Sequence, residues 1–302
     1  MDTHRLLIFR EVARAESIAA AARALGWTQP AVSQHLRLLE RQAGTPLVVR
    51  HSRGIRLTEA GTTLLRHADA IATRLRAAED DMAALANLSA GTVRLAAFPS
   101  ASATLVPAAM TELAEHHPGL EVRLLEQEPP QAVDLVTAGA ADLALIFSHD
   151  DRPPGHGRDL LLTRLAEDQV RLVVPACHPA EAAGPAALPL LADDPWIAGC
   201  PTCAAHLIRT CEAAGFTPDV RHNTDDYVVV QTLVARRLGV ALLPQLALDA
   251  YHHPGVRSLP LPDSSGRSLY LVRHREALRI PAVETATEAI RRAVAASGRP
   301  AV

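Results

Sequence analysis

The chain has 302 residues, of which 48% are hydrophobic and 21% charged, and its formal net charge is −3. An apolar half with charges of both signs is typical of a folded globular protein and excludes an intrinsically disordered chain. The length allows roughly two domains with buried cores.

The balance of charge changes along the chain. Residues 1–60 contain nine arginines and five acidic residues, a balance of +4, whereas residues 61–302 contain 21 arginines and 28 acidic residues, a balance of −7. A basic segment of this kind favours contact with a polyanion. The N-terminal segment is therefore the candidate for binding nucleic acid.

Apolar runs in the sequence are too short to cross a membrane, and the N-terminus has no basic-then-apolar leader. We therefore expect a cytoplasmic protein with no membrane partner. Its four cysteines are expected to be reduced at rest in that compartment.

Two helices are predicted first. Residues 4–16 form one, with the inward side chains Leu7, Phe9, Val12 and Ala13. The second begins after the capping residue Ser17, ends at Gly26, and has the apolar stripe Ile18, Ala21, Ala22 and Leu25.

The next helix has two chemically different faces. Thr28 caps it, and Pro30 is tolerated in its first turn. The inward stripe is Val32, Leu36, Leu39 and Ala43. The residues placed to contact base edges or phosphates of DNA are Thr28, Gln29, Pro30, Ser33, Gln34, Arg37 and Arg41. A solvated polar face is the alternative explanation.

A short basic hairpin follows this helix. Residues 47–49 and 55–57 are β-prone and flank a turn. Arg50, Arg53 and Arg56 lie near its tip, where they can contact phosphates. Helix, turn, helix and hairpin in this order predict an all-α winged helix-turn-helix over residues 1–58.

Thr58 caps a long helix over residues 59–87. Apolar residues recur along it for three heptads, at Leu64, Ala68, Ile71, Leu75, Ala78, Met82 and Leu85. Because a small head has little core to cover such a seam, we predict a homodimer through a linker region, residues 59–90, that ends in a hinge at 89–91. Two heads at a fixed separation predict an operator with dyad symmetry. A helix packed within its own domain is the alternative.

The N-terminal part of the chain resembles the DNA-binding half of LysR-type transcriptional regulators. The resemblance covers residues 1 to about 90, and its ordered matches include residues 21–25, 28–34, 44–47 and 57–61. It implies sequence-specific binding to double-stranded promoter DNA, dimers that pair into tetramers, and RNA polymerase as a further partner. Trp27 departs from the family pattern, and we expect it to pack rather than to contact DNA.

Beyond residue 91, predicted strands alternate with helices. They include strands at 93–98, 120–127, 143–147 and 240–243, and helices at 101–116, 132–139, 227–238 and 282–296. The alternation predicts an α/β domain over 91–302 with two lobes joined by two crossover strands. Lobe I comprises about 91–165 and 266–302, and lobe II about 166–265. Residues 138–145 and 238–244 resemble the effector-binding domain of the same family, which is similar to periplasmic solute-binding proteins.

Small molecules bind open parallel sheets beyond the carboxyl ends of strands, where helix N-termini offer free N–H groups. Hydroxyls at two such helix starts favour a carboxylate or similar oxyanion. By the resemblance, a small-molecule effector binds there, and its expected contacts are Pro99, Ser100, Ser102, Phe147, Ser148, Cys200, Thr202 and Cys203. Ordinary helix capping is the alternative role of these hydroxyls.

The family does not prescribe the motif Cys200-Pro-Thr-Cys203. A thiol at a helix N-terminus is acidified, so a switchable disulfide is chemically reasonable. Cys200, Cys203, His206 and Cys211 are also donors for zinc, but the usual distant second pair of ligands is missing. Three interpretations stay open: a structural or ligand-lining pair, a redox sensor, and a metal site. We predict no cofactor and no resident metal.

The favoured interpretation is a dimeric DNA-binding regulator whose heads are reoriented when an effector closes the two lobes. A thiol-dependent enzyme with Cys200 as nucleophile is the alternative from another class, but no base and orienting acid stand at a recognisable spacing from it. A solute-binding protein does not explain the basic head. We therefore predict a regulator and no enzymatic activity.

Overall fold

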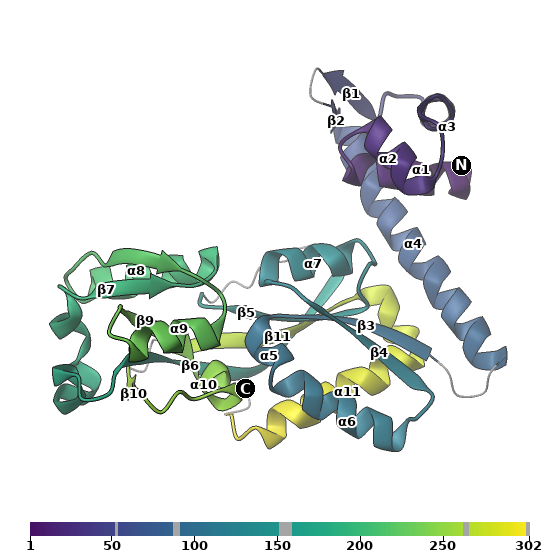
Figure 1. Ribbon diagram of the computed structural model, residues 1–302. Coiled ribbons are helices and arrows are strands. Elements are labelled where there is room, and N and C mark those ends of the chain that lie inside the picture. Colours follow the sequence, from purple (N-terminus) through teal and green to yellow (C-terminus); the bar gives the residue numbers. More distant parts are fainter. Residues whose placement is uncertain (52–53, 87–90, 151–158, 262–265, 300–302) are drawn as a thin grey trace. The chain divides into compact units, whose positions relative to one another are not determined.

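The computed structural model describes residues 1–51, 54–86, 91–150, 159–261 and 266–299. The chain forms two compact units, Met1–Met82 and Ala83–Val302 (Figure 1). Arg53, residues 89–90 of the expected hinge and the side chain of Leu85 lie outside the described residues. Within the described part of the chain, no helix is both long and apolar enough to span a membrane.

The first unit, here called the head, contains three helices and a hairpin. These elements are α1 (Thr3–Arg14), α2 (Ile18–Leu25), α3 (Gln29–Ala43), β1 (Val48–His51) and β2 (Gly54–Leu57). All five contribute to one core, which includes Phe9, Val12, Ala21, Val32, Leu36, Leu39, Val48 and Ile55. The predicted winged helix-turn-helix is confirmed.

Local chemistry determines where α2 and α3 begin and end. The Ser17 hydroxyl accepts the N–H of Ala20 at 3.3 Å, which satisfies one of the free donors at the start of α2. Gly26 ends α2 with a φ of 66°, a left-handed conformation that glycine adopts without steric strain. Thr28 occupies the N-cap of α3 without a side-chain hydrogen bond, and Pro30 lies in the first turn.

Helix α4 (Glu59–Ala86) is anchored to the head at its N-terminal half. Thr58 caps it, because its Oγ1 accepts the N–H of Gly61 at 3.0 Å. Asp69 accepts hydrogen bonds from Arg10 Nε at 2.8 Å and from Arg14 at 2.7 Å. These two contacts tie α4 to α1 and fix the direction in which the linker helix leaves the head.

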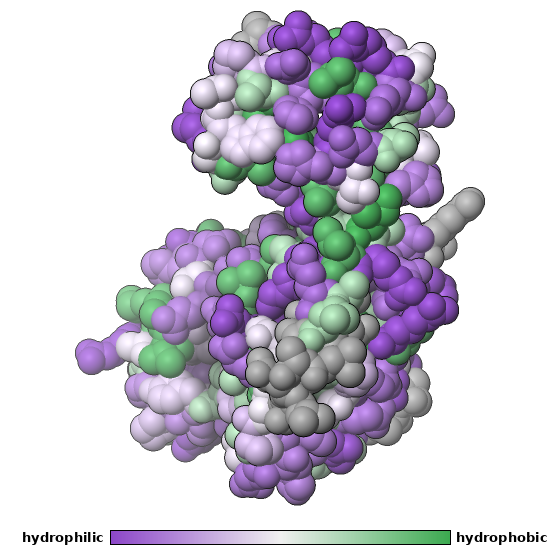
Figure 2. Space-filling view, turned by 90° about the vertical axis from the view of Figure 1, so that its right-hand side faces the viewer, coloured by the Kyte–Doolittle hydropathy of each residue, from purple (hydrophilic) through white to green (hydrophobic). Residues whose placement is uncertain are grey.

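The predicted heptad seam of α4 divides into two parts. Leu64 and Ala68 pack in the core of the head itself. Four later positions of the seam, Ile71, Leu75, Ala78 and Met82, are exposed. Figure 2 shows hydrophobic residues on the surface of this helix. An apolar surface on a helix that has left its core is unusual in an isolated chain.

Lobe I is built on a parallel sheet. Its elements are β3 (Gly91–Ala97), α5 (Pro99–Ser102), α6 (Leu105–His116), β4 (Leu120–Glu126), α7 (Pro129–Thr137), β5 (Leu143–Ser148) and α11 (Pro281–Ala296). Strand β3 pairs in parallel with β4 and β5. Helices α6 and α11 pack side by side against this sheet (Figure 1).

Lobe II repeats the parallel arrangement. It contains η1 (Pro179–Ala186), η2 (Leu188–Leu191), β7 (Pro195–Ala198), α8 (Pro201–Ala213), β8 (Asp219–Asn223), α9 (Tyr227–Ala235), β9 (Val240–Pro244), α10 (Gln245–Ala250) and β10 (Val256–Pro260). Strand β7 pairs in parallel with β8 and β9. Trp196 on β7 is fully buried in the core of this lobe.

Two long strands connect the lobes. They are β6 (Leu160–Pro175) and β11 (Gly266–His274), which pair with each other antiparallel. Strand β11 also pairs with β5 of lobe I, whereas the second half of β6 pairs with β9 and β10 of lobe II. The two lobes therefore share one sheet with the order β4-β3-β5-β11-β6-β9-β7-β8. The fold of two lobes with two crossover strands is confirmed.

Three details of the predicted elements are wrong. The helix expected over 101–116 is broken into α5 and α6, because Pro107 in a continuous helix would clash with the carbonyl of Ala103. The break places Pro107 in the first turn of α6. Helix α7 begins at Pro129 rather than at 132, since proline is tolerated at a helix start. The short helix α10 was not expected.

Candidate nucleic-acid interface and inter-lobe site

Helix α3 presents a polar face to solvent. Val32, Leu36 and Leu39 are buried on the opposite side. Ser33 is half-buried, and the exposed members of the predicted DNA-contacting set are Thr28, Gln29, Pro30, Gln34, Arg37 and Arg41. Arg37 Nε donates to the Ser33 carbonyl at 3.2 Å, which orients part of the guanidinium along the helix. This face offers amide, hydroxyl and guanidinium groups of the kinds that recognise base edges.

The hairpin is fixed to α3 by one carboxylate. Glu40 Oε1 accepts the N–H of Leu47 at 2.9 Å and that of Val48 at 3.3 Å. Gly54 lies so close to the turn between α1 and α2 that an added Cβ would be 2.4 Å from the Glu16 carbonyl oxygen. These contacts attach both strands of the hairpin, here called the wing, to the helices of the head, and Arg50 and Arg56 are exposed on the two strands.

Trp27 packs in an aromatic cluster at the turn before α3. Its ring centroid is 5.5 Å from that of His4 and 5.2 Å from that of His35. The side chain stays partly exposed, at 38%. The packing role expected for Trp27 agrees with these contacts, although the residue is at the surface.

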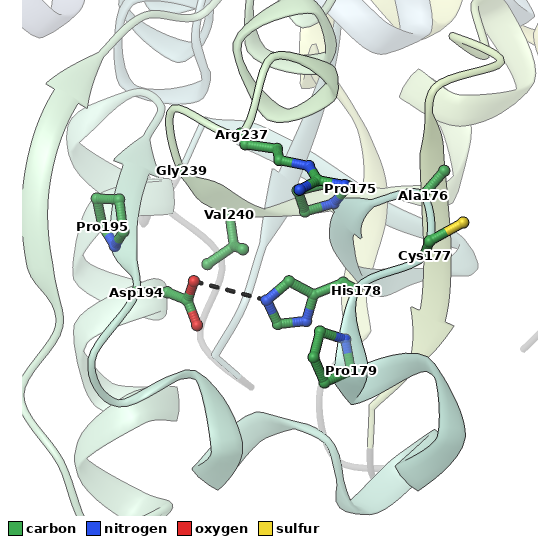
Figure 3. Close-up of a pocket in the computed structure, with 10 residues that line it drawn as sticks. All are labelled: Pro175, Ala176, Cys177, His178, Pro179, Asp194, Pro195, Arg237, Gly239 and Val240. Carbon is green, nitrogen blue, oxygen red and sulfur yellow. Dashed lines mark ion pairs between the residues drawn. The ribbon is translucent and has the colours of Figure 1, made fainter.

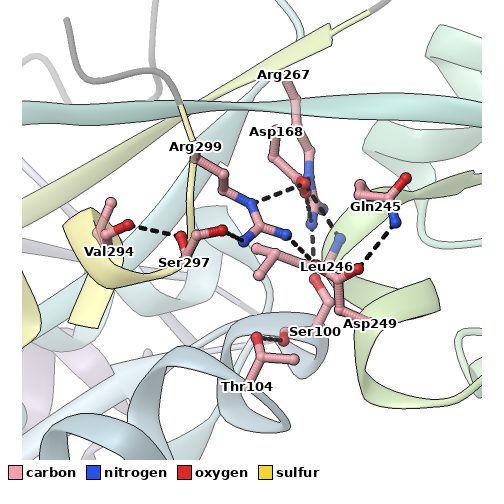
Figure 4. Close-up of polar contacts among 10 residues, drawn as sticks. All are labelled: Ser100, Thr104, Asp168, Gln245, Leu246, Asp249, Arg267, Val294, Ser297 and Arg299. Carbon is pink, nitrogen blue, oxygen red and sulfur yellow. Dashed lines mark hydrogen bonds and ion pairs between the residues drawn. The ribbon is translucent and has the colours of Figure 1, made fainter.

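A buried arginine occupies the centre of the predicted effector site. Arg267 on β11 donates to Ser100 Oγ of α5 at 2.6 Å (Figure 4). Its guanidinium carbon lies 4.8 Å from the ring centroid of Phe98 and 4.4 Å from that of Phe147. Two aromatic faces and a hydroxyl thus surround a charge that has almost no contact with water.

Asp168 on β6 neutralises this arginine. Its carboxylate accepts from Arg267 Nε at 3.0 Å and from Arg299 Nε at 3.3 Å. It also accepts the N–H of Leu246 at the start of α10, at 3.1 Å. Burial is the largest single effect on the pKa of Arg267 and lowers it, but attraction to Asp168, Tyr227 and Cys203 together raises the pKa above its ordinary value. The pair joins the two crossover strands at the point where the lobes meet.

The two thiols of the Cys200 motif are in contact. Their sulfur atoms are 3.1 Å apart, and Cys203 N–H donates to Cys200 Sγ at 3.4 Å. The hydrogen bond to Cys203 and burial raise the pKa of Cys200. The hydrogen bond from Cys200, helped by the positive charge of Arg267, lowers the pKa of Cys203. Cys203 is therefore the more acidic thiol of the pair.

Glu128 and Tyr227 complete the inter-lobe site. Burial raises the pKa of the Glu128 carboxyl, and its Oε2 is buried without a hydrogen-bond partner. Burial likewise raises the pKa of Tyr227 to about 12, although a hydrogen bond to Ser100 opposes it. Glu128 of lobe I and Cys200, Cys203 and Tyr227 of lobe II border a space of about 30 Å³.

Two histidines stack between the lobes beside this site. His149 follows β5, and His206 lies on α8; their ring centroids are 3.9 Å apart and their planes differ by 7°. Burial lowers the pKa of His149 to about 2 and that of His206 to about 4. Both rings are therefore neutral near pH 7, which allows them to stack without repulsion.

The predicted effector residues fall into two groups. Ser100, Phe147 and Cys203 gather around Arg267, and Cys200 contacts Cys203. Two others form hydrogen bonds within their own segments of the chain. Ser102 Oγ donates to the Ala97 carbonyl at 3.2 Å, and Ser148 Oγ donates to the Asp150 carbonyl at 2.9 Å. Pro99 and Thr202 are half-buried in the first turns of α5 and α8.

Four residues that shape the site were not predicted from the sequence: Glu128, Asp168, Tyr227 and Arg267. Asp168 and Arg267 lie in strands that contain other charged residues, among them Glu167 and Arg171 in β6 and Arg273 in β11, so the sequence pattern did not distinguish them. Among the described residues, no group of three or more His, Cys, Asp or Glu side chains is arranged to hold a metal ion.

Comparison with known families gives two matches. The family described as "LysR substrate binding domain" matches residues 86–295, and "Bacterial regulatory helix-turn-helix protein, lysR family" matches residues 3–62. The HTH-type transcriptional regulator TtuA of Agrobacterium vitis is 27% identical over 273 residues, covering 89% of this chain and 88% of that protein. A probable hydrogen peroxide-inducible genes activator of Mycobacterium avium is 30% identical over 259 residues, covering 80% and 78%.

Several solved structures share the fold. A full-length OxyR variant from Pseudomonas aeruginosa has a TM-score of 0.68 at 21% identity and covers 96% of this chain and 95% of its own. Full-length BenM has a TM-score of 0.60 at 20% identity, with 99% of each chain covered. Full-length CbnR, solved as a complex with its target DNA, has a TM-score of 0.60 at 20% identity and covers 97% and 100%.

Proposed function

The chain belongs to the LysR family of transcriptional regulators, and from this we propose that it binds dyad-symmetric promoter DNA as a dimer under the control of a small carboxylate. The carboxylate would bind between the lobes of the effector-binding domain. The observation that carries the proposal is that one chain contains both an exposed polar face on α3 and a buried, protonated arginine, Arg267, between the lobes.

In the head, α3 would enter the major groove and the hairpin would follow the phosphates. Gln34, Arg37 and Arg41 are exposed on α3 and have the donor groups that base edges require. Arg50 and Arg56 of the wing would contact phosphates, and we assign the same role to Arg53. The Glu40 contacts to the wing support this division of roles, since they keep the wing at a fixed angle to α3.

The dimer would form through the exposed seam of α4. Ile71, Leu75 and Met82 are large apolar side chains on one helix with no cover from the head. Two copies of this seam would bury each other and set the spacing between the heads. Pairing of dimers into tetramers, contact with RNA polymerase and a location in the cytoplasm are further parts of the proposal.

The effector would compete with Asp168 for Arg267. A carboxylate drawn into the site would meet this guanidinium, the Ser100 hydroxyl and the first turn of α8 with Thr202. Breaking the Arg267–Asp168 pair would loosen the joint between the crossover strands. Movement of the lobes would then alter the distance between the two heads on DNA.

We also infer that the chain is not an enzyme with Cys200 as its nucleophile. The Cys200 thiol contacts Cys203 rather than an imidazole, and its pKa is raised instead of lowered. A thiol nucleophile needs an adjacent base or an acidified thiol.

A test of the effector proposal uses the full-length protein. A panel of small carboxylic acids is titrated by calorimetry, and each acid that binds is then added during measurement of DNA affinity. Ser100→Ala and Thr202→Ala should weaken binding of the acid at least about tenfold, because charge-assisted hydrogen bonds are lost. Thr232→Ala, an exposed position on α9, is the matched control. Equal binding by all three variants would contradict the assignment of the site.

The contact between Cys200 and Cys203 favours a second candidate, a thiol switch. The 3.1 Å separation of the sulfur atoms needs only a small movement to reach the bond length of a disulfide. A peroxide would oxidise the Cys203 thiolate to a sulfenate with release of water or alcohol, and the Cys200 thiol would then displace hydroxide to give the disulfide. The name of the Mycobacterium avium relative, a probable activator of hydrogen peroxide-inducible genes, supports this candidate.

The thiol switch is tested by DNA affinity before and after treatment with hydrogen peroxide. Cys200→Ser and Cys203→Ser should lose any response of the wild type, whereas Cys177→Ser, which changes an exposed thiol elsewhere in lobe II, should keep it. A wild-type affinity that peroxide does not alter would exclude the switch and leave the carboxylate effector as the controlling signal.

A further inference from the structure

A second cavity lies in lobe II and shares no lining residue with the inter-lobe site. It is bounded by the end of β6, the start of β7 and the C-terminal end of α9 (Figure 3). Its volume is about 190 Å³. A cavity of this size has room for a small organic molecule, since roughly 10–15 Å³ of such space already holds one water molecule.

Arg237 provides a cation at the edge of this cavity. It follows the C-cap of α9 with a φ of 60°, and the next residue, Leu238, donates its N–H back to the Leu233 carbonyl at 3.0 Å. This is the left-handed position that ends many helices, where glycine is favoured and an L side chain is strained. Among the described residues, the structure gives its guanidinium no ion pair or hydrogen bond.

An incompletely paired carboxylate also borders the cavity. His178 Nδ1 accepts the N–H of Ala180 at 3.2 Å, so in the neutral ring the hydrogen is on Nε2. That Nε2 faces Asp194 Oδ1 at 3.6 Å (Figure 3), which is too long for a hydrogen bond. The Asp194 carboxylate, 30% exposed, therefore retains capacity to accept from a ligand.

The backbone around the cavity is unusually constrained. Cys177, on the turn after β6, has a φ of 64°, so two of the three described non-glycine residues with positive φ border this one cavity. Gly239 lets β9 approach β7 closely, since an added Cβ would be 2.9 Å from the Pro195 carbonyl oxygen. Strain gathered in one place is typical of a functional site, because the surrounding structure must hold it.

We propose that this cavity binds a small α-amino acid as a second ligand of the regulator. The carboxylate of the ligand would pair with Arg237, and its ammonium group with Asp194 beside His178. The remaining walls, from Pro175, Pro195 and Val240, are apolar and suit a short side chain. Alanine is small enough to enter a space of this volume. This site goes beyond the inter-lobe effector site and does not depend on it.

The site is tested by calorimetric titration of the full-length protein with glycine, L-alanine and L-serine. Propionate, which lacks the ammonium group, and ethylamine, which lacks the carboxylate, are the comparison probes. At least one of the three amino acids should give saturable binding, and both comparison probes should bind at least about tenfold more weakly.

Substitutions then locate the binding. Arg237→Gly removes the guanidinium but suits the left-handed backbone, so it should abolish amino-acid binding without lowering the melting temperature. Asp194→Asn should weaken binding, whereas Arg236→Gln, at the neighbouring exposed arginine, should leave it unchanged. The proposal is overturned if none of the three amino acids binds, or if Arg237→Gly binds them as the wild type does.

Discussion

Asp168 shows how a single residue organises the effector-binding domain. Its carboxylate is fully buried, yet it accepts hydrogen bonds from two arginines and one backbone N–H drawn from different parts of the chain. A buried charge is tolerated when its partners replace the lost hydration. The same carboxylate therefore stabilises the joint between the lobes and holds Arg267 in the position where an effector would meet it.

Removing this carboxylate should destabilise the domain strongly. Asp168→Ala leaves Arg267 buried without its counter-charge, and we expect a loss of about 3–5 kcal/mol in the free energy of unfolding. Asp249→Ala, which removes an exposed carboxylate that also pairs with Arg299, should change it by less than about 1 kcal/mol. Urea unfolding followed by tryptophan fluorescence measures both. Similar losses for the two variants would contradict the role given to Asp168.

The stacked histidines predict a pH dependence. Their pKa values, about 2 for His149 and about 4 for His206, lie below the ordinary 6.5. The unfolded chain therefore binds more protons below pH 6.5, and stability that is complete above this value is lost as the pH falls toward the folded pKa values. We expect a loss of about 2 kcal/mol from His206 alone between pH 6.5 and 5.

His206→Gln should flatten this pH dependence, because it removes one of the two buried titrating groups. The exposed His252 provides the matched control, and His252→Gln should keep the wild-type slope. Unfolding in urea at a series of pH values measures the effect. A wild-type stability that does not change between pH 7 and 5 would show that the stack is absent in solution.

At the scale of elements, the head follows closely from its sequence. Ser17, Gly26 and Thr58 determine where helices begin or end, and the apolar period of α3 selects its buried side. Such signals are local, so a single sequence contains them. Helix α10, by contrast, has only six residues and is stabilised by Asp168, 78 positions earlier in the chain. No local pattern could indicate it.

The seam of α4 gives a test at this scale. Leu75→Glu places a charge at an exposed apolar position, and two copies of α4 should then no longer pair. We expect monomers in sedimentation velocity at concentrations where the wild type is a dimer. Thr63→Glu adds the same charge at an exposed position outside the seam and should leave the dimer intact. A Leu75→Glu protein that sediments as the wild type would mean that dimers form elsewhere.

The helix and the wing of the head should respond differently to substitution. Arg37→Ala on α3 should relax base preference as well as weaken binding, because this side chain is assigned to base edges. Arg56→Ala on the wing should weaken binding to all sequences alike and reduce the salt slope by roughly 0.9, as expected for one phosphate contact. Affinity for specific and random DNA at several salt concentrations separates the two. Equal losses on both DNAs for both variants would contradict the assignment.

At the scale of the whole molecule, the lobes and their crossover strands could be predicted, but the centre of the site could not. Tyr227, Arg267 and Ser100 meet from three distant segments, and only the three-dimensional path of the chain brings them together. The hydroxyl of Ser100 was expected from its place after a strand. The arginine that it contacts, Arg267, was not expected, since a charged residue near the start of a strand that also contains Arg273 has no local signature.

The central claim is that paired heads bind a symmetric DNA site. It is tested most directly by footprinting the reduced, full-length protein on the DNA upstream of its own gene and of any divergent neighbour. The account predicts protection of two half-sites related by a dyad and lying on one side of the duplex, and loss of this protection in Leu75→Glu. Protection of a single half-site, or none at low salt by an intact dimer, would contradict it.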